Sequence, residues 1–324
     1  MRPATSEVRM TTVRTIDFHG YSGCLALESG SARVILGPHC GGRVLSYSHG
    51  EVEAVALDPA QSGWTWRPGA AEIDPWGGRF DVGPEYTLPP HPALWLGPWS
   101  AEADAAGVAR LASGVDPNTG LRIVREFRLD ATGAHLRCTQ RVTNAGTAPR
   151  ACCHWGRTLA PGGGILVVPA TPGSRLPHGY VQYDSSRRGL LDFVPRDPSV
   201  RLRDGFLEVF GPLQHPKLCF DSTAGWLAYL LPPGLLFVKR WPVFPERPYG
   251  ELGNFTLSVW CWQDRVAELE PIGPQEVLAP GATASFTEDW WLLAHPFPAR
   301  RDGLDLAAVA EKVEREARGR SVPS

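Results

Sequence analysis

The sequence lacks two features that mark large or extended partners: a patch of basic residues and a long apolar run. Its 32 Lys and Arg residues are mixed along the chain with 34 Asp and Glu residues, for a formal net charge of −2. Without a cluster of cations to neutralise phosphates, we expect no nucleic acid partner. No apolar run could span a bilayer, and the polar start of the chain lacks the apolar centre of a signal peptide. We therefore expect a cytoplasmic protein with no membrane partner.

Sequence motifs for metals, nucleotides and covalent catalysis are also missing. The 7 cysteines are too few, and odd in number, for a disulfide framework. Cys152, Cys153 and His154 look like a metal cluster, but on a strand Cys153 would point away from its two neighbours, and no CxxC or HxxxH pair adds ligands. No GxGxxG, GxxxxGK[ST] or GxSxG sequence occurs. We predict no metal and no cofactor, and we interpret the cysteines as buried reduced thiols.

Tryptophan, proline and glycine are abundant instead. The chain contains 12 Trp, 31 Pro and 35 Gly, so that proline and glycine make up about a fifth of its 324 residues. They are scattered between short apolar runs, which is typical of many strands joined by turns rather than of disorder. Tryptophan fills β cores, and its indole face also stacks on the C–H face of a pyranose sugar. The composition therefore favours an all-β protein and is compatible with sugar binding.

Alternation of apolar and polar residues locates several strands. Residues 121–129, 136–142 and 151–155 alternate and are joined by Gly-containing turns, which predicts an antiparallel meander. Residues 225–231 and 235–241 flank Pro-Pro-Gly, which predicts a hairpin.

The two ends of the chain differ from this β pattern. We predict a flexible N-terminus over residues 1–14, one β domain over residues 15–298, and a C-terminal helix and tail over residues 299–324. The helix is indicated by apolar residues spaced for one helical face, with Asp302 or Asp305 as a cap: Leu306, Val309, Ala310 and Val313. No internal repeat or linker divides the β region.

Residues 58–100 are rich in Pro, Gly and Trp and carry no clear strand pattern. A loop of this length inside a compact domain usually has a function. Arg79, Glu85 and His91 place both signs of charge beside aromatic residues, as at the rim of a ligand cleft. The alternative is a loop that only covers a sheet edge.

Two glutamates and one histidine are the candidates for chemistry. Glu268 and Glu270 are separated by one residue in an apolar run, so on a strand both carboxylates reach the same face. His154 stands at the expected end of its strand and could donate a proton near neutral pH. A solvated pair of acids and a structural histidine are the alternatives to a catalytic site.

Two stretches carry a resemblance to a known superfamily. Residues 143–149 (TNAGTAP), then four further residues and then His154 and Trp155, resemble an epimerase pattern in which N-x-[ST/G]-x-x-P precedes a strand ending in His-x-aromatic. Residues 269–271 (LEP), then 278–281 (LAPG) and a closing aromatic strand, resemble its glutamate region. The chain thus resembles the galactose mutarotase-like superfamily of aldose 1-epimerases, closest to an uncharacterised bacterial branch. The resemblance implies a β-supersandwich of large antiparallel sheets.

The resemblance also implies roles for individual residues. Glu270 would be the general base on the anomeric hydroxyl and His154 the general acid on the ring oxygen. His91, matched by the weaker pattern of residues 90–92 (PHP) before Trp99, and Arg79 would orient the sugar. Other substrate-binding candidates are Glu85 at the rim, Glu268 beside the base, and a stacking tryptophan such as Trp95, Trp155 or Trp241. The implied partner is a small-molecule sugar or an oligosaccharide.

The sequence departs from the epimerase pattern after both of its key residues. Residues 271–274 (PIGP) and 155–158 (WGRT) replace the segments that follow the glutamate and the histidine in epimerases. An aldose or uronate epimerase is therefore the leading hypothesis, and a non-catalytic carbohydrate-binding or sensing protein is the second. A polysaccharide lyase or hydrolase on the same fold is the third, with Tyr86, Tyr249 and Arg247 as candidates for its chemistry. The sequence does not predict the oligomeric state.

Overall fold

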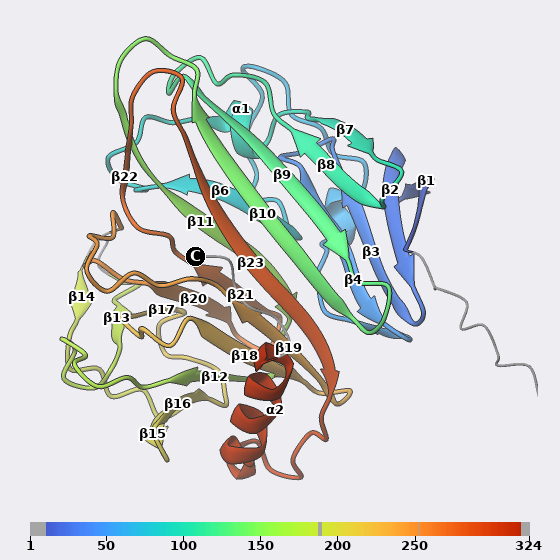
Figure 1. Cartoon of the computed structure of the whole chain (residues 1–324). Helices are drawn as coiled ribbons and strands as arrows, with labels where there is room; N and C mark the ends of the chain where they lie inside the picture. Colours follow the sequence, from blue (N-terminus) through green and yellow to red (C-terminus); the bar gives the residue numbers. More distant parts are fainter. Residues whose placement is uncertain (1–10, 187–189, 252, 319–324) are drawn as a thin grey trace, which may run out of the picture.

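Two large antiparallel sheets make up most of the fold (Figure 1). The computed structural model describes residues 11–186, 190–251 and 253–318. Within these residues the first sheet has 13 strands in the order β1-β2-β3-β4-β6-β11-β21-β20-β17-β13-β14, with β5 beside β4 and β22 beside β11. Its strands are β1 (Thr12–Phe18), β2 (Tyr21–Ser29), β3 (Ala32–Gly37), β4 (Arg43–His49), β5 (Val52–Glu53), β6 (Gly78–Gly83), β11 (Arg150–Pro161), β13 (Val181–Tyr183), β14 (Leu191–Asp192), β17 (Lys217–Phe220), β20 (Leu257–Trp262), β21 (Val266–Pro271) and β22 (Glu276–Leu278).

The second sheet has 10 strands in the described residues, in the order β15-β16-β12-β18-β19-β23-β10-β9-β8-β7. They are β7 (Ser100–Ala103), β8 (Val108–Ala112), β9 (Leu121–Leu129), β10 (His135–Asn144), β12 (Ile165–Pro169), β15 (Val200–Arg203), β16 (Phe206–Val209), β18 (Trp226–Leu231), β19 (Leu235–Arg240) and β23 (Thr283–Ala294). Two α-helices, α1 (Pro92–Trp95) and α2 (Leu306–Arg318), and two 3-10 turns, Pro59–Gln61 and Arg301–Gly303, complete the described elements.

The main core lies between the two sheets and follows from the alternation along their strands. On β9, Leu121, Ile123 and Phe127 are buried while Arg122 and Arg128 are exposed, as the sequence pattern predicts. The fold is therefore the all-β supersandwich of large antiparallel sheets that the resemblance implied.

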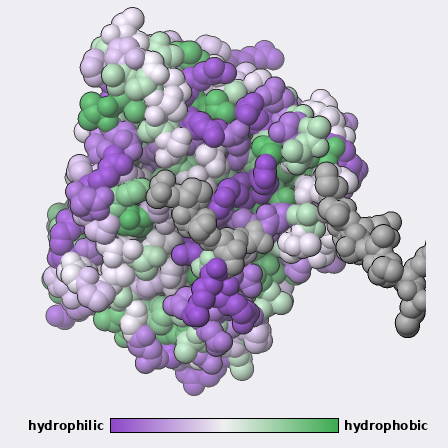
Figure 2. All heavy atoms as spheres, in the orientation of Figure 1, coloured by the Kyte–Doolittle hydropathy of each residue, from purple (hydrophilic) through white to green (hydrophobic). Residues whose placement is uncertain are grey.

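A second core lies on the other face of the second sheet, under helix α2 (Figure 1). Leu306, Val309 and Val313 are buried against strands β12, β18 and β19, which confirms the predicted helical face. Asp305 accepts a hydrogen bond from the Ala308 N–H at 3.0 Å and caps the helix. Among the described residues no helix has the length and apolarity needed to cross a bilayer. Figure 2 shows hydrophilic and hydrophobic residues interspersed over the visible face.

The hairpin of β18 and β19 is confirmed, but three local predictions need correction. Strand β10 pairs with β9 and β23 whereas β11 pairs with β6, β21 and β22, so the chain changes sheets instead of continuing the meander. The predicted loop 58–100 contains β6, a central strand. Residues 12–14, predicted as flexible, belong to β1, while residues 1–10 lie outside the described part.

Candidate functional site

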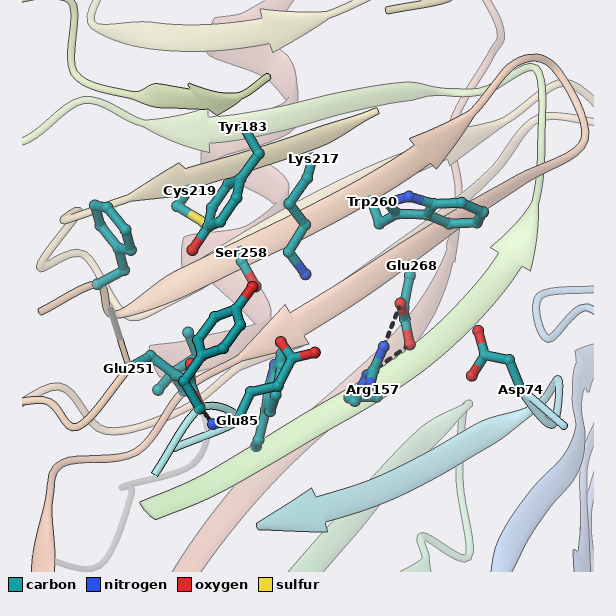
Figure 3. Close-up of a pocket in the computed structure, with 14 residues that line it drawn as sticks. Asp74, Glu85, Arg157, Tyr183, Lys217, Cys219, Glu251, Ser258, Trp260 and Glu268 are labelled. Carbon is teal, nitrogen blue, oxygen red and sulfur yellow. Dashed lines mark hydrogen bonds and ion pairs between the residues drawn. The ribbon is translucent and has the colours of Figure 1, made fainter. Parts of the chain in front are cut away.

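Alternate residues of neighbouring strands place polar side chains on the face of the first sheet that points away from the second. Residues directly opposite each other in an antiparallel pair share a face. Arg157 of β11 lies opposite Arg79 of β6, and Glu270 of β21 lies opposite Ser258 of β20. Strand β17 adds Lys217, which lies opposite Trp260. Figure 3 shows Arg157, Lys217, Ser258 and Trp260 among the side chains that line one pocket.

The prediction of His154 as a general acid is wrong. His154 lies opposite Val82 of β6 and points with it into the core between the sheets, where it is 1% exposed. Its ring stacks on Phe286, with centroids 5.5 Å apart, and its centroid lies 5.8 Å from that of Phe80. Burial lowers the pKa of His154 to about 4, so the imidazole is neutral at neutral pH. Strand β11 runs on to Pro161, so His154 is inside the strand, and alternation gives the pocket face to Trp155 and not to His154.

Glu270 is on the pocket side of the sheet, but it lies beneath the surface and is 0% exposed. Its Oε1 accepts a hydrogen bond from Lys217 Nζ at 2.5 Å. Its Oε2 accepts from the Trp155 indole N–H at 2.9 Å and from the Ser258 hydroxyl at 2.8 Å. With both oxygens occupied and no exposed surface, Glu270 is placed to hold Lys217 and Trp155. The structure gives it no contact with the pocket that a base on a sugar hydroxyl needs.

Glu268 reaches the pocket and is held in a network of arginines. Arg157 donates to its two oxygens through Nε at 2.9 Å and Nη2 at 3.2 Å, and Arg79 Nη2 lies 3.5 Å from Oε1. Burial alone would raise the pKa of Glu268, but Arg157 and Arg79 outweigh it and hold that pKa well below its usual range. Glu268 is therefore a fixed carboxylate that can accept hydrogen bonds from a ligand.

The cleft has two adjacent parts. The first compartment, of about 330 Å³, lies among Trp155, Tyr183, Lys217, Glu251, Ser258 and Glu268. The second compartment, of about 710 Å³, lies among Arg79, Asp81, His91, Trp95, Trp155 and Arg157. Trp155 and Arg157, together with Asp74 and Glu85, line both compartments, so the two lie side by side.

Glu251 enters the first compartment from the loop before β20. Its Oε1 accepts the Glu85 N–H at 2.9 Å. The Glu251 carboxyl packs directly against the backbone at Gly83. Any other residue there would clash with it, because a Cβ at position 83 would lie 2.2 Å from Glu251 Oε1. Burial, aided by the charge of Glu85, raises the pKa of Glu251 to about 7. Glu251 therefore exchanges a proton in the neutral pH range.

His91 and Asp81 form an ion pair in the second compartment. His91 Nε2 lies 2.8 Å from Asp81 Oδ1, and His91 Nδ1 lies 2.8 Å from the Pro89 carbonyl oxygen. Burial opposes protonation of His91, but the hydrogen bond and charge of Asp81 outweigh it and raise the pKa of His91 to about 9. The pKa of Asp81 is lowered in turn, because the bond to His91 outweighs its burial. His91 is therefore a cationic donor at neutral pH.

The cleft brings together most of the predicted binding residues. Arg79, Glu85, His91, Glu268, Trp155 and Trp95 all line it. Of the lyase candidates, Tyr86 lines the first compartment, whereas Tyr249 and Arg247 line a separate hollow with Arg175 and Asp221. Among the described residues no group of three or more His, Cys, Asp or Glu side chains is arranged to hold a metal ion.

Sequence reasoning missed Asp81, Arg157, Lys217 and Glu251. The alternation of the strands could have identified the first two. Asp81 shares a face with Arg79, because Phe80 lies between them, and Arg157 shares a face with Trp155, which it follows by two residues. Lys217 lies on a four-residue strand and Glu251 on a loop, where no periodicity marks a site.

Fold and cleft together define a β-supersandwich protein with a polar, aromatic pocket on one sheet face. The fold is that of the galactose mutarotase-like proteins. The chain is similar to the Slr1438 protein from Synechocystis sp. PCC 6803 at 14% identity and a TM-score of 0.56, over 91% of this chain and 100% of that one. It is similar to a candidate aldose 1-epimerase from Escherichia coli K12 at 15% identity and a TM-score of 0.53, over 88% and 99%. A galactose mutarotase-like protein from Lactobacillus casei aligns at 11% identity and a TM-score of 0.53, over 84% and 100%.

These identities show a shared fold alone. No family model and no curated protein matches the sequence.

Proposed function

We propose that this protein binds a neutral pyranose sugar in the first compartment and accelerates the exchange of its anomers. The observation that carries the proposal is the arrangement of Glu251 and Lys217. A carboxyl group and an ammonium group line the same pocket beside the indole of Trp155. The galactose mutarotase-like fold supports the choice of a sugar as the ligand.

Exchange of anomers needs one group that takes a proton and one that gives a proton. The O1 proton passes to Glu251 as the C1–O5 bond breaks and the C1 carbonyl forms. The electron pair of that bond stays on O5, which takes a proton from Lys217. Rotation about the C1–C2 bond and the reverse steps then close the ring as the other anomer. No oxidant or reductant is consumed.

Glu251 has the properties of the base. Its pKa of about 7 lies near neutral pH. A general base with such a pKa is largely deprotonated and still binds a proton strongly. Figure 3 shows Glu251 and Glu268 on opposite sides of the pocket with Lys217 between them. A ring placed beside Trp155 would therefore have hydrogen-bonding groups at both edges.

Lys217 supplies the positive charge, and Glu270 positions it. Burial by itself would lower the pKa of Lys217, but the charge of Glu270 outweighs burial and raises that pKa. Lys217 Nζ lies 5.4 Å from the centroid of the Trp155 ring. The ammonium is thus held at the pocket wall, where it can stabilise charge on O5.

The charge around the pocket selects a neutral ligand. The acidic and basic side chains that line the first compartment are four carboxyls and two cations, namely Asp74, Glu85, Glu251, Glu268, Arg157 and Lys217. Both cations are paired, Arg157 with Glu268 and Lys217 with Glu270. A phosphate or carboxylate on the sugar would find no unpaired cation here and would be repelled by the acids.

The test measures anomer exchange by NMR exchange spectroscopy on the H1 signals of glucose, galactose, xylose, glucuronate and glucose 6-phosphate. We expect acceleration of at least one neutral sugar and none of the two anions. Glu251→Gln should lower kcat/KM about 100-fold or more, the scale on which a general base contributes. Glu102→Gln, at a carboxylate with 68% exposed side chain outside the cleft, is the matched control. If no neutral sugar exchanges faster with the protein than without it, the proposal fails.

A non-catalytic sugar-binding protein is the second candidate. The observation that favours it is the pairing of Glu268 with Arg157 and of Glu270 with Lys217, since both predicted carboxylates are already committed to ion pairs. Calorimetric binding of a sugar with an unchanged exchange rate would decide for this candidate.

A further inference from the structure

The cleft is larger than one sugar ring requires. Ligand pockets in proteins typically have volumes of about 300–1,000 Å³. The first compartment, about 330 Å³, and the second, about 710 Å³, each reach that size separately. They share Trp155 and Arg157 as lining residues, so the two compartments are neighbours on the same sheet face.

The second compartment has the components of a sugar subsite. Arg79, Asp81 and His91 are buried at 9% exposure or less, and ion pairs fix their orientations. Arg79 offers N–H donors and Asp81 a carboxylate acceptor, the pair of functions that a vicinal diol satisfies, while His91 uses both ring nitrogens to hold Asp81 and the Pro89 carbonyl. Trp95 is half-buried beside them, with the Arg79 guanidinium 5.2 Å from its ring centroid. A planar apolar surface next to fixed polar groups suits a pyranose, which has one C–H face and a rim of hydroxyls.

The charges of the second compartment also favour a neutral ligand. Four carboxylates line it, Glu72, Asp74, Asp81 and Glu85, against three cations, Arg79, Arg157 and protonated His91. Each of these cations has a carboxylate within ion-pair distance. A phosphate group in the second compartment would therefore gain no unpaired cation.

We propose that the cleft binds a neutral oligosaccharide of at least two rings, with the reducing-end ring in the first compartment and the next ring beside Trp95 in the second. The glycosidic bond would cross between the compartments at Trp155 and Arg157. The orientation rests on the proposed function, because the free anomeric hydroxyl must lie near Glu251. The two-ring footprint does not depend on whether exchange is catalysed.

The test compares monosaccharides with their dimers by isothermal titration calorimetry on the full chain: glucose with maltose and cellobiose, and galactose with lactose. We expect at least one disaccharide to bind at least 10-fold more tightly than its monosaccharide. Trp95→Ala should lower the ratio of the two association constants to about 1, and Trp95→Phe, which keeps an aromatic ring, should retain most of it. Glu102→Gln should leave the ratio unchanged, and circular dichroism reports whether each variant is folded.

Two results would overturn the proposal. One is equal affinity for every monosaccharide and its dimer. The other is a loss in Trp95→Ala that is the same for both ligands, since a single-ring site explains that pattern. Absence of any anomer exchange together with tight disaccharide binding would refute the proposed function and support the two-ring cleft, so the two failures are distinguishable.

Discussion

Replacing Lys217 by methionine tests whether Glu270 is a structural anchor. The substitution keeps most of the aliphatic stem but removes the ammonium that lies 2.5 Å and 2.6 Å from the two Glu270 oxygens. The Glu270 carboxylate would remain fully buried with only Trp155 and Ser258 as donors. Removing one partner of a buried ion pair typically costs about 3–5 kcal/mol because the other charge is left uncompensated.

We expect the low end of that range, about 3 kcal/mol, because Glu270 keeps two donors and the Lys217 side chain is already 21% exposed. The entropy of unfolding at the midpoint is about 2.1 cal/mol/K per residue, or about 0.7 kcal/mol/K for 324 residues. Lys217→Met should therefore lower Tm by about 4 °C in differential scanning calorimetry. The exposed Arg128, which alternation places on the solvent side of β9, provides the control: Arg128→Met should change stability by less than about 0.5 kcal/mol.

A double-mutant cycle sharpens this test. Glu270→Gln should cost less than Lys217→Met, because the remaining ammonium can reach water whereas the remaining carboxylate cannot. The double variant should recover part of the loss, with a coupling energy of about 1–3 kcal/mol. An unchanged Tm in Lys217→Met would refute the reasoning. If Glu251→Gln kept full exchange activity while Glu270→Gln lost it, the assignment of the base to Glu251 would be refuted too.

Three further predictions concern titrating groups. His154→Phe should leave anomer exchange unchanged and shift stability by less than about 1.5 kcal/mol, since the ring lies among aromatic neighbours; a large loss of activity in the folded variant would restore an acid role. The folded-state pKa of His91, about 9, exceeds the unfolded value of about 6.5, so its stabilisation is complete below pH 6.5 and is lost as pH rises through 9. In Asp81→Asn, stability should no longer fall as pH rises through 9, and an NMR titration should show the His91 pKa lowered by more than one unit. An unchanged His91 pKa would contradict the ion pair. With Glu251 as the base, kcat/KM should fall as pH drops through about 7, and a profile flat from pH 5 to 9 would exclude that role.

The strands that carry clear alternation were predictable because burial on one face imposes a period of two. β9 and the β18–β19 hairpin follow this rule, and α2 follows the helical period with Asp305 as its cap. The same rule places Glu268 and Glu270 on one face, which is correct. It also places His154 and Trp155 on opposite faces, so the sequence contained the reason that only one of them reaches the cleft.

The sequence by itself determined the all-β class, the helix and the faces of the strands that alternate clearly, because these depend on neighbours two to four residues away. Only the tertiary structure decided which face of β11 borders the cleft, because that depends on which sheet the chain joins after β10. It also decided the roles of the carboxyl groups. Lys217 lies 53 residues from Glu270 in the chain, yet it fixes that carboxylate beneath the pocket. Glu251 lies 166 residues from Glu85, and its burial, aided by the charge of Glu85, raises its pKa. No local pattern encodes such pairs, since burial and charge act through space and not along the chain.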